Sequence, residues 1–248
     1  MRMFAATAMG ACLALSGSVL ADGEDDLLYG NRPFEVAPGE NDGVFSDAMA
    51  SQGQYEINGY ALGQRFSVLQ GGSTVKSIRF WAASEYVFEG ESQDALSLNI
   101  TNIEIAIFRV VSGTNQFPEV ARWILPTASI SQDKTGNVIP VILSPVFQMD
   151  TALAGNVTLS GGDYVLSIGG VLADPFEGSR FAWVDGEADG ANPATRSYAS
   201  ISGSWGSWVP FTQPGSPSGA FELYGEIPAP STLLALAALA PRRRRRPD

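Results

Sequence analysis

Between residues 54 and 226, short apolar runs alternate with clusters of turn-forming residues. The runs are rich in Val, Ile, Phe, Tyr and Trp, and Gly, Asn, Asp and Ser separate them, which is the pattern of strands joined by turns. The predicted strands are residues 64–69, 75–82, 103–111, 122–131, 141–149, 156–159, 164–168, 181–184, 197–201, 208–211 and 220–226. No window of ten or more residues in this region has convincing helical periodicity, so the sequence predicts an all-β domain.

Several predicted strands alternate between apolar and polar positions. In the run 102–109, Ile103, Ile105 and Ile107 share one face, and Glu104 lies opposite them. Similar alternation occurs in residues 75–81 and 220–226. A period of two indicates sheets with one buried face and one solvated face. We therefore expect a two-sheet antiparallel sandwich of jelly-roll type.

The segment before this domain has a different composition. Residues 22–53 are acidic and rich in turn formers, and we interpret them as a loosely ordered leader with room for one edge strand. The predicted organisation is a signal peptide at 1–21, this acidic segment at 22–53, a β-sandwich at 54–226 and a tail at 227–248.

The N-terminus has the layout of a secretory signal peptide. Arg2 precedes an apolar stretch that ends in Val19-Leu20-Ala21, which predicts cleavage between Ala21 and Asp22. A buried N-terminal helix is the alternative. The sequence Gly10-Ala11-Cys12 weakly resembles a lipoprotein cleavage site. Cys12 lies too early for that role, because only a short apolar stretch precedes it.

The scarcity of cysteine and the absence of histidine exclude several kinds of catalysis and metal binding. Cys12 is the one cysteine and histidine is absent. After signal cleavage, the chain has no thiol for disulfides, nucleophilic catalysis or metal binding. Without histidine there is no Ser-His-Asp triad and no His-ligated zinc or copper. We expect no cofactor, with calcium as the one ion to consider.

The chain is acidic except at its ends. Its formal net charge is −11 at pH 7, although Arg2 and residues 242–246 contribute six of the 15 basic residues. An acidic body repels nucleic acid and anionic membrane surfaces. We therefore expect no nucleic-acid partner, and we do not interpret the arginine run as a nucleic-acid arm.

The tail has three parts in a fixed order. They are the turn Pro228-Ala229-Pro230-Ser231, the apolar residues 233–240 and the arginines Arg242, Arg243, Arg244, Arg245 and Arg246. Together with the signal peptide, this order resembles PEP-CTERM proteins, which are exported bacterial surface proteins with a C-terminal sorting signal. The resemblance implies an exosortase-type processing enzyme as partner, transient tethering to the inner membrane, cleavage near the turn, and delivery to the cell surface or extracellular matrix.

The body resembles the sandwich that such proteins often carry in the pattern and order of its strands, from TVKSIRFWA to the last strand AFELYGEIP. The tail differs from the family in two features. Ala229 stands where the family has a glutamate, and the apolar segment 233–240 spans only about 12 Å as a helix against about 30 Å of hydrocarbon. A short hydrophobic helix suits a transient sorting address. A lasting anchor and a disordered end are the alternatives.

One acidic loop resembles the start of a calcium site. Asp185, Glu187 and Asp189 alternate before a glycine, as do the first oxygen ligands of a calcium loop. Arg196 occupies the twelfth position, where an EF-hand needs glutamate, so an EF-hand is excluded. A looser calcium site and a solvated acidic loop are the two interpretations.

A second acidic cluster contains Glu85, Glu89, Glu91 and Asp94. A pair of carboxylates across a groove could act as the acid and base of a glycosidase. The other interpretation is a polar loop whose side chains are solvated.

Two tryptophans, Trp205 and Trp208, lie among Ser and Gly residues. Exposed indole rings stack on the apolar faces of sugars, and Trp183 and Tyr198 could extend such a platform. The alternative places one tryptophan in the core and the other at a sheet edge.

These features predict a secreted, non-enzymatic protein of the cell surface or matrix, with a structural or adhesive role. A carbohydrate-binding module for exopolysaccharide is the alternative, and a glycosidase-like enzyme on a lectin-type sandwich is the third possibility.

Overall fold

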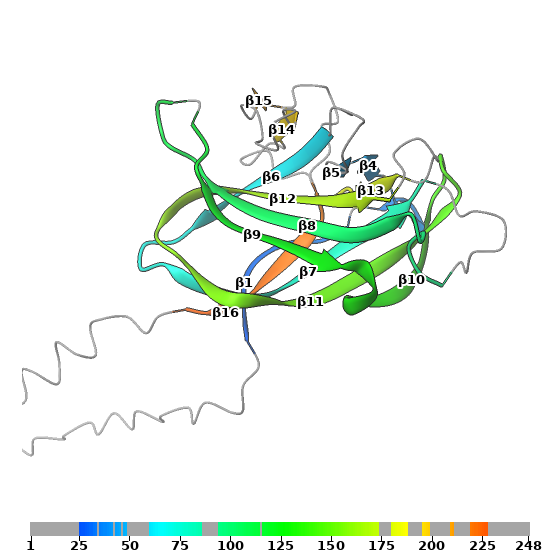
Figure 1. Ribbon diagram of the computed structural model, residues 1–248, viewed down its shortest axis with the longest axis horizontal. Helices are drawn as coiled ribbons and strands as arrows, with labels where there is room; N and C mark the ends of the chain where they lie inside the picture. Colours follow the sequence, from blue (N-terminus) through cyan, green and yellow to red (C-terminus); the bar gives the residue numbers. More distant parts are fainter. Residues whose placement is uncertain are drawn as a thin grey trace, which may run out of the picture.

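The computed structural model describes residues 25–33, 35–41, 43–45, 47–48, 60–85, 94–114, 116–173, 180–187, 195–198, 209–210 and 219–227. These residues form strands in two sheets, with one short 3-10 helix, η1 (Thr127–Ser129), and no α-helix (Figure 1). The described part of the chain is thus nearly all β, as predicted. The predicted signal peptide and tail helix lie outside it.

The first sheet has nine strands among the described residues. They are β1 (Asp26–Asn31), β2 (Glu35–Ala37), β3 (Glu40–Asn41), β4 (Gly43–Phe45), β7 (Ser73–Ser84), β10 (Ser131–Ile139), β11 (Ser144–Leu159), β13 (Phe181–Val184) and β16 (Phe221–Glu226). The strand order is β1-β16-β7-β11-β10-β3-β2, and β13 pairs with β7 and β4. Every pairing is antiparallel except that of β10 with β3.

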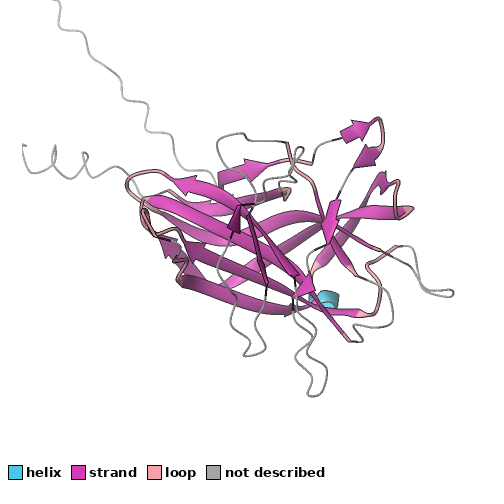
Figure 2. Cartoon of the chain, turned by 90° about the horizontal axis from the view of Figure 1, so that it is seen from above, coloured by secondary structure: helices cyan, strands magenta, loops and turns pink. Residues whose placement is uncertain are grey.

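The second sheet has seven strands among the described residues. They are β5 (Asp47–Ala48), β6 (Tyr60–Val68), β8 (Ile100–Arg109), β9 (Glu119–Pro126), β12 (Gly162–Leu172), β14 (Thr195–Tyr198) and β15 (Val209–Pro210). The order is β15-β14-β6-β5-β12-β8-β9, with a further pairing of β6 with β12. Figure 2 shows the strands from above, with η1 as the one helical turn drawn.

One hydrophobic core joins the two sheets. Phe66 and Ile105 from the second sheet are buried with Phe80, Phe147 and Phe221 from the first. The rings of Phe66 and Phe221 meet edge to face across the sheets, with centroids 6.0 Å apart. Burial of these large side chains is the main source of stability in such a fold.

The predicted core face of β8 is confirmed, but the opposite face is not solvated, because Glu104, Ala106 and Phe108 are buried as well. Ile103, Ile105 and Ile107 are all buried in the shared core. Glu104 points to the opposite face, where its carboxylate lies 3.0 Å from Nη1 of Arg122 on β9. The period of two in the sequence therefore identified the core face correctly.

The acidic segment differs from the prediction of a loosely ordered leader. Residues 26–48 contain the five strands β1 to β5, which belong to both sheets. β1 runs antiparallel to β16, and Tyr29 stacks on Phe221 with ring centroids 5.0 Å apart. β1 therefore lies at the edge of the first sheet beside the C-terminal strand, in the segment where one edge strand was expected.

Two strand boundaries in the middle of the chain also differ. The predicted strand 122–131 ends at Pro126 with η1, and a separate, polar strand follows as β10. The predicted strands 141–149 and 156–159 are one strand, β11, with an irregularity between Ala152 and Val157. Gly155 lies in that irregularity with φ of 95°, so it marks a bulge and not a strand end.

Candidate functional site

Trp183 does not belong to a surface platform. It lies in the middle of β13 with 0% of its surface exposed, and its Nε1 donates a hydrogen bond to the carbonyl of Ala220 at 2.9 Å. Its ring packs near Phe221. The structure therefore corrects the proposed sugar contact of Trp183, which is a core residue. Trp205, Trp208 and the side chain of Tyr198 lie outside the described residues.

The first part of the predicted calcium loop is extended backbone. Asp185 forms a β-bridge with Gly219, and Gly186 forms one with Pro33. A Cβ atom on Gly186 would lie 2.4 Å from Nδ2 of Asn31, so this glycine permits close packing at that point. Asp189 lies outside the described residues. Within the described part of the chain no three acidic, His or Cys side chains form a group able to hold a metal, and calcium binding through Asp185, Glu187 and Asp189 stays a prediction.

The second acidic cluster is described only at its two ends. The backbone N–H of Glu85 donates to the carbonyl of Arg180 at 2.8 Å, and Asp94 lies 3.7 Å from Nζ of Lys134. Glu89 and Glu91 lie outside the described residues. A catalytic carboxylate pair here stays a prediction.

The two ends of the described domain meet at one lysine. Nζ of Lys76 on β7 lies 3.0 Å from Asp25 Oδ1 and 2.6 Å from Glu226 Oε1. These carboxylates raise the pKa of Lys76, chiefly through the hydrogen bond to Glu226. Asp25 precedes β1 and Glu226 ends β16, so the chain enters and leaves the domain at the same edge. No helix of the described residues is long and apolar enough to span a membrane.

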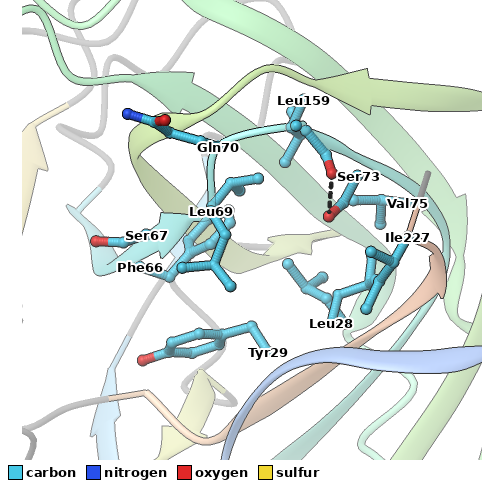
Figure 3. A pocket seen from close by; sticks show the side chains of 14 residues that line it. Leu28, Tyr29, Phe66, Ser67, Leu69, Gln70, Ser73, Val75, Leu159 and Ile227 are labelled. Carbon is cyan, nitrogen blue, oxygen red and sulfur yellow. Dashed lines mark hydrogen bonds between the residues drawn. The ribbon is translucent and has the colours of Figure 1, made fainter. Parts of the chain in front are cut away.

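A pocket of about 160 Å³ opens near this edge. Strands β1, β6, β7, β11 and β16 contribute its walls, and Figure 3 shows its side chains. Its apolar wall is formed by Leu28, Phe66, Val68, Val75, Leu159 and Leu223. Leu69 and Ile227 also line it and are largely exposed, at 86% and 59%. They therefore form an apolar rim.

The turn between β6 and β7 shapes the pocket entrance. The N–H of Gly72 donates to the carbonyl of Leu69 at 3.2 Å and closes this turn. Gly71 and Gly72 have φ of 114° and 78°, which L-residues with side chains rarely adopt. A Cβ atom on Gly72 would also lie 2.6 Å from the carbonyl oxygen of Leu159. The two glycines thus let the turn lie against β11 and expose Leu69.

The two serines in the lining have hydrogen-bond partners on the protein, and Tyr29 and Gln70 are its other polar side chains. Ser67 Oγ donates to Asp163 Oδ1 at 2.7 Å, and Ser73 Oγ donates to the carbonyl of Gly72 at 2.8 Å (Figure 3). None of the described residues that line the pocket is charged. The pocket therefore offers burial to an apolar group, and its described lining presents no carboxylate, lysine or arginine to it.

A second notable cluster lies on the outer face of the first sheet. The side chain of Glu222 is only 4% exposed, and its carboxylate lies 3.1 Å from Arg32 Nε and 3.5 Å from Arg79 Nη1. Tyr224 donates its hydroxyl to the same carboxylate, and Asp150 accepts from Arg79 Nε at 2.8 Å. Burial, followed by the hydrogen bond to Glu222, raises the pKa of Tyr224 to about 12.

This cluster links four separate parts of the first sheet. Arg32 follows β1, Arg79 lies on β7, Asp150 on β11 and Glu222 on β16. The two positive and two negative side chains balance one another, so the cluster has no net charge to attract a ligand. We interpret it as a structural network that fixes β16 beside β7.

Comparison of the chain with models of protein families, with curated proteins and with solved structures finds no match. The function is therefore argued from the residues, the fold and the site geometry.

Proposed function

We propose that this protein is an exported bacterial β-sandwich of jelly-roll type, routed by its PEP-CTERM-like tail to the cell surface or extracellular matrix. Its role there is structural or adhesive, and it has no enzymatic activity. An exosortase-type enzyme is its processing partner. The tail holds it at the inner membrane until it is processed.

The observation that carries this proposal is the position of the last strand. β16 ends at Glu226, and the Pro-Ala-Pro-Ser turn begins two residues later at Pro228. Cleavage near the turn removes no described strand. The sheet that remains is complete at that end, which is what a disposable address requires.

The N-terminal end supports the same organisation. The predicted cleavage between Ala21 and Asp22 precedes β1, which begins at Asp26. β1 pairs antiparallel with β16 from Asp26 to Asn31, and Lys76 binds both Asp25 and Glu226. The two predicted cuts therefore fall just outside the first and last strands, which hold each other in the sheet.

Intact-mass analysis of the protein recovered from the cell exterior tests the proposal. We expect a form that begins at Asp22 and ends between Pro228 and Ser231, and we expect it in the biofilm fraction. As a control, the double substitution Pro228→Ala and Pro230→Ala should keep the signal cleavage but retain the tail. Recovery of the wild-type protein with Asp248 intact would overturn the sorting part of the proposal.

A further inference from the structure

The pocket beside Asp25 and Glu226 is built from five strands. Its wall residues Phe66, Val75, Leu159 and Leu223 are buried, while Val68 is half-buried and packs on the core. For scale, an enclosed apolar cavity of about 150 Å³ holds benzene. A pocket of about 160 Å³ therefore has room for roughly six carbon atoms.

We propose that this pocket binds the end of a saturated hydrocarbon chain, as found in acyl or alkyl amphiphiles. The described lining has no charged side chain, and its two serines donate to protein acceptors. The apolar surface continues outward over the exposed side chains of Leu69 and Ile227. A flat, compact ligand would contact only the pocket walls. An alkyl chain can fill the pocket with its end and also contact the rim residues Leu69 and Ile227.

The surroundings of the pocket also select the head group. Ser67 in the lining donates to the carboxylate of Asp163, and Glu226 directly precedes Ile227 on the rim. Lys76 lies between Glu226 and Asp25, so these three side chains leave one negative charge in excess. The carboxylate of Asp163 adds another. Negative charges at the entrance repel an anionic head group. The ligand is therefore an uncharged or zwitterionic amphiphile, and a free fatty acid binds less tightly than the alcohol of the same length.

The position of the tail provides one source for such a chain, and this step alone rests on the proposed function. Only residues 228–232 lie between the rim residue Ile227 and the first leucine of the apolar segment. Five extended residues span at most about 17 Å. A tail held in the membrane keeps the pocket entrance close to phospholipid acyl chains.

Titration of the full-length protein with n-alkyl alcohols from butanol to decanol, followed by calorimetry, tests the pocket. We expect affinity to rise about fourfold per methylene and to flatten beyond about eight carbons, with decanoate weaker than decanol. Val68→Phe fills the pocket and should lower affinity at least tenfold. Val120→Phe is the matched control, since Val120 lies on β9, outside the lining, with 40% exposure.

Leu69→Ser provides a variant on an exposed turn that leaves the core unchanged. It should reduce binding of decanol several-fold and leave butanol binding unchanged. If wild type and Val68→Phe bind the alcohols with equal affinity, the pocket assignment is wrong. It is also wrong if the affinity of Val68→Phe rises with alcohol chain length as steeply as that of Val120→Phe.

Flotation with phosphatidylcholine vesicles distinguishes the source of the chain. If the lipid is the source, full-length protein should float, and Val68→Phe should reduce the bound fraction. Pocket-dependent binding of alcohols without this reduction identifies a free amphiphile as the ligand. Because alcohol binding needs neither cleavage nor sorting, it can hold even if the intact-mass experiment overturns the proposed role of the tail.

Discussion

Gly219 lies directly against the indole of Trp183. A Cβ atom built on Gly219 would come within 2.3 Å of Cε2 of that ring. The next residue, Ala220, accepts the hydrogen bond from Trp183 Nε1. The approach of Gly219 to β13 therefore places the start of β16 and buries the largest side chain of the core.

This contact predicts that Gly219→Ala is strongly destabilising. The new methyl group must displace a ring that is fully buried, and overpacking of a core costs about 1–3 kcal/mol or more. For a domain of this size, the melting temperature falls by about 2–4 °C per kcal/mol. Gly30→Ala is the control, because a Cβ atom on Gly30 would have Cγ of Glu222 as its nearest neighbour, at 3.4 Å. Equal melting temperatures for the two variants would contradict this role of Gly219.

The buried carboxylate of Glu222 gives a second prediction. Glu222→Gln removes the negative charge that faces Arg32 and Arg79. Removal of one partner from a buried ion pair costs about 3–5 kcal/mol, but both arginines are partly exposed and Arg79 keeps Asp150. We therefore expect a loss of about 2 kcal/mol in urea unfolding. Glu119→Gln, at a half-exposed pair with Arg122, should cost less than about 1 kcal/mol. A reversed order would contradict the structural role of the Glu222 network.

The sequence predicts a strand when the pattern that identifies it lies within the strand's own residues. The alternation of Ile103, Ile105 and Ile107 is local, because a strand shows its buried face in its own sequence. One edge strand was expected somewhere in residues 22–53, but β1 itself was not located, because the residues around it are acidic and turn-rich and its partner β16 lies almost at the other end of the chain. β10 was missed because it is polar and has no alternation.

The candidate sites follow the same rule. Trp183 was placed in a sugar platform, yet its strand FAWV is an unbroken apolar run, which is typical of a strand buried on both faces, and all four residues are buried. That local signal could have identified it as core. The hydrocarbon pocket could not be predicted, because its wall combines residues from five strands. Likewise Arg32 and Glu222 are 190 residues apart.

The raised pKa of Tyr224 predicts a loss of stability at high pH. The ordinary pKa of tyrosine is 10.0, and burial with the hydrogen bond to Glu222 raises it to about 12. Below pH 10 the hydroxyl is protonated in both the folded and the unfolded chain, so its stabilising effect is complete. Between pH 10 and 12 only the unfolded chain loses this proton, and the effect declines.

Urea unfolding of wild type and Tyr224→Phe from pH 8 to 12 measures this effect. The wild-type midpoint should fall more steeply than that of the variant above pH 10, because the variant has no proton to lose. The pKa of Lys76 is also raised, chiefly by its hydrogen bond to Glu226, but Lys76 is present in both proteins and its contribution cancels in the comparison. In absorbance at 295 nm, the wild type should show a tyrosine that ionises near pH 12, and the variant should lack it. Parallel midpoint curves would contradict the proposed cause.

Sugar binding through Trp205 and Trp208 stays a prediction, now without Trp183. If these rings stack on exopolysaccharide, a pull-down with the polymer should retain the wild-type protein and lose most of the variant with both Trp205→Ala and Trp208→Ala. Because both rings would stack on the same polymer, removing the two together should decide retention. Leu98→Ala, at an exposed position in the described part of the chain, is the control. Retention of the double variant would exclude the platform.

Ala229 provides the most direct test of the tail, because it stands where the PEP-CTERM pattern has glutamate. If an exosortase-type enzyme recognises the Pro-x-Pro turn, Ala229→Glu should raise the fraction of exported protein that lacks the tail. Substitution of Arg242 to Arg246 by alanine should lower that fraction, since the basic end holds the segment on the cytoplasmic side. Both changes lie beyond Glu226, where the last strand ends, so the melting temperature of the body should stay unchanged. The readout is the ratio of short to full-length mass in one culture. If neither substitution changes that ratio, the tail is not read as a sorting signal, and a lasting anchor becomes the better explanation of its leucines and arginines.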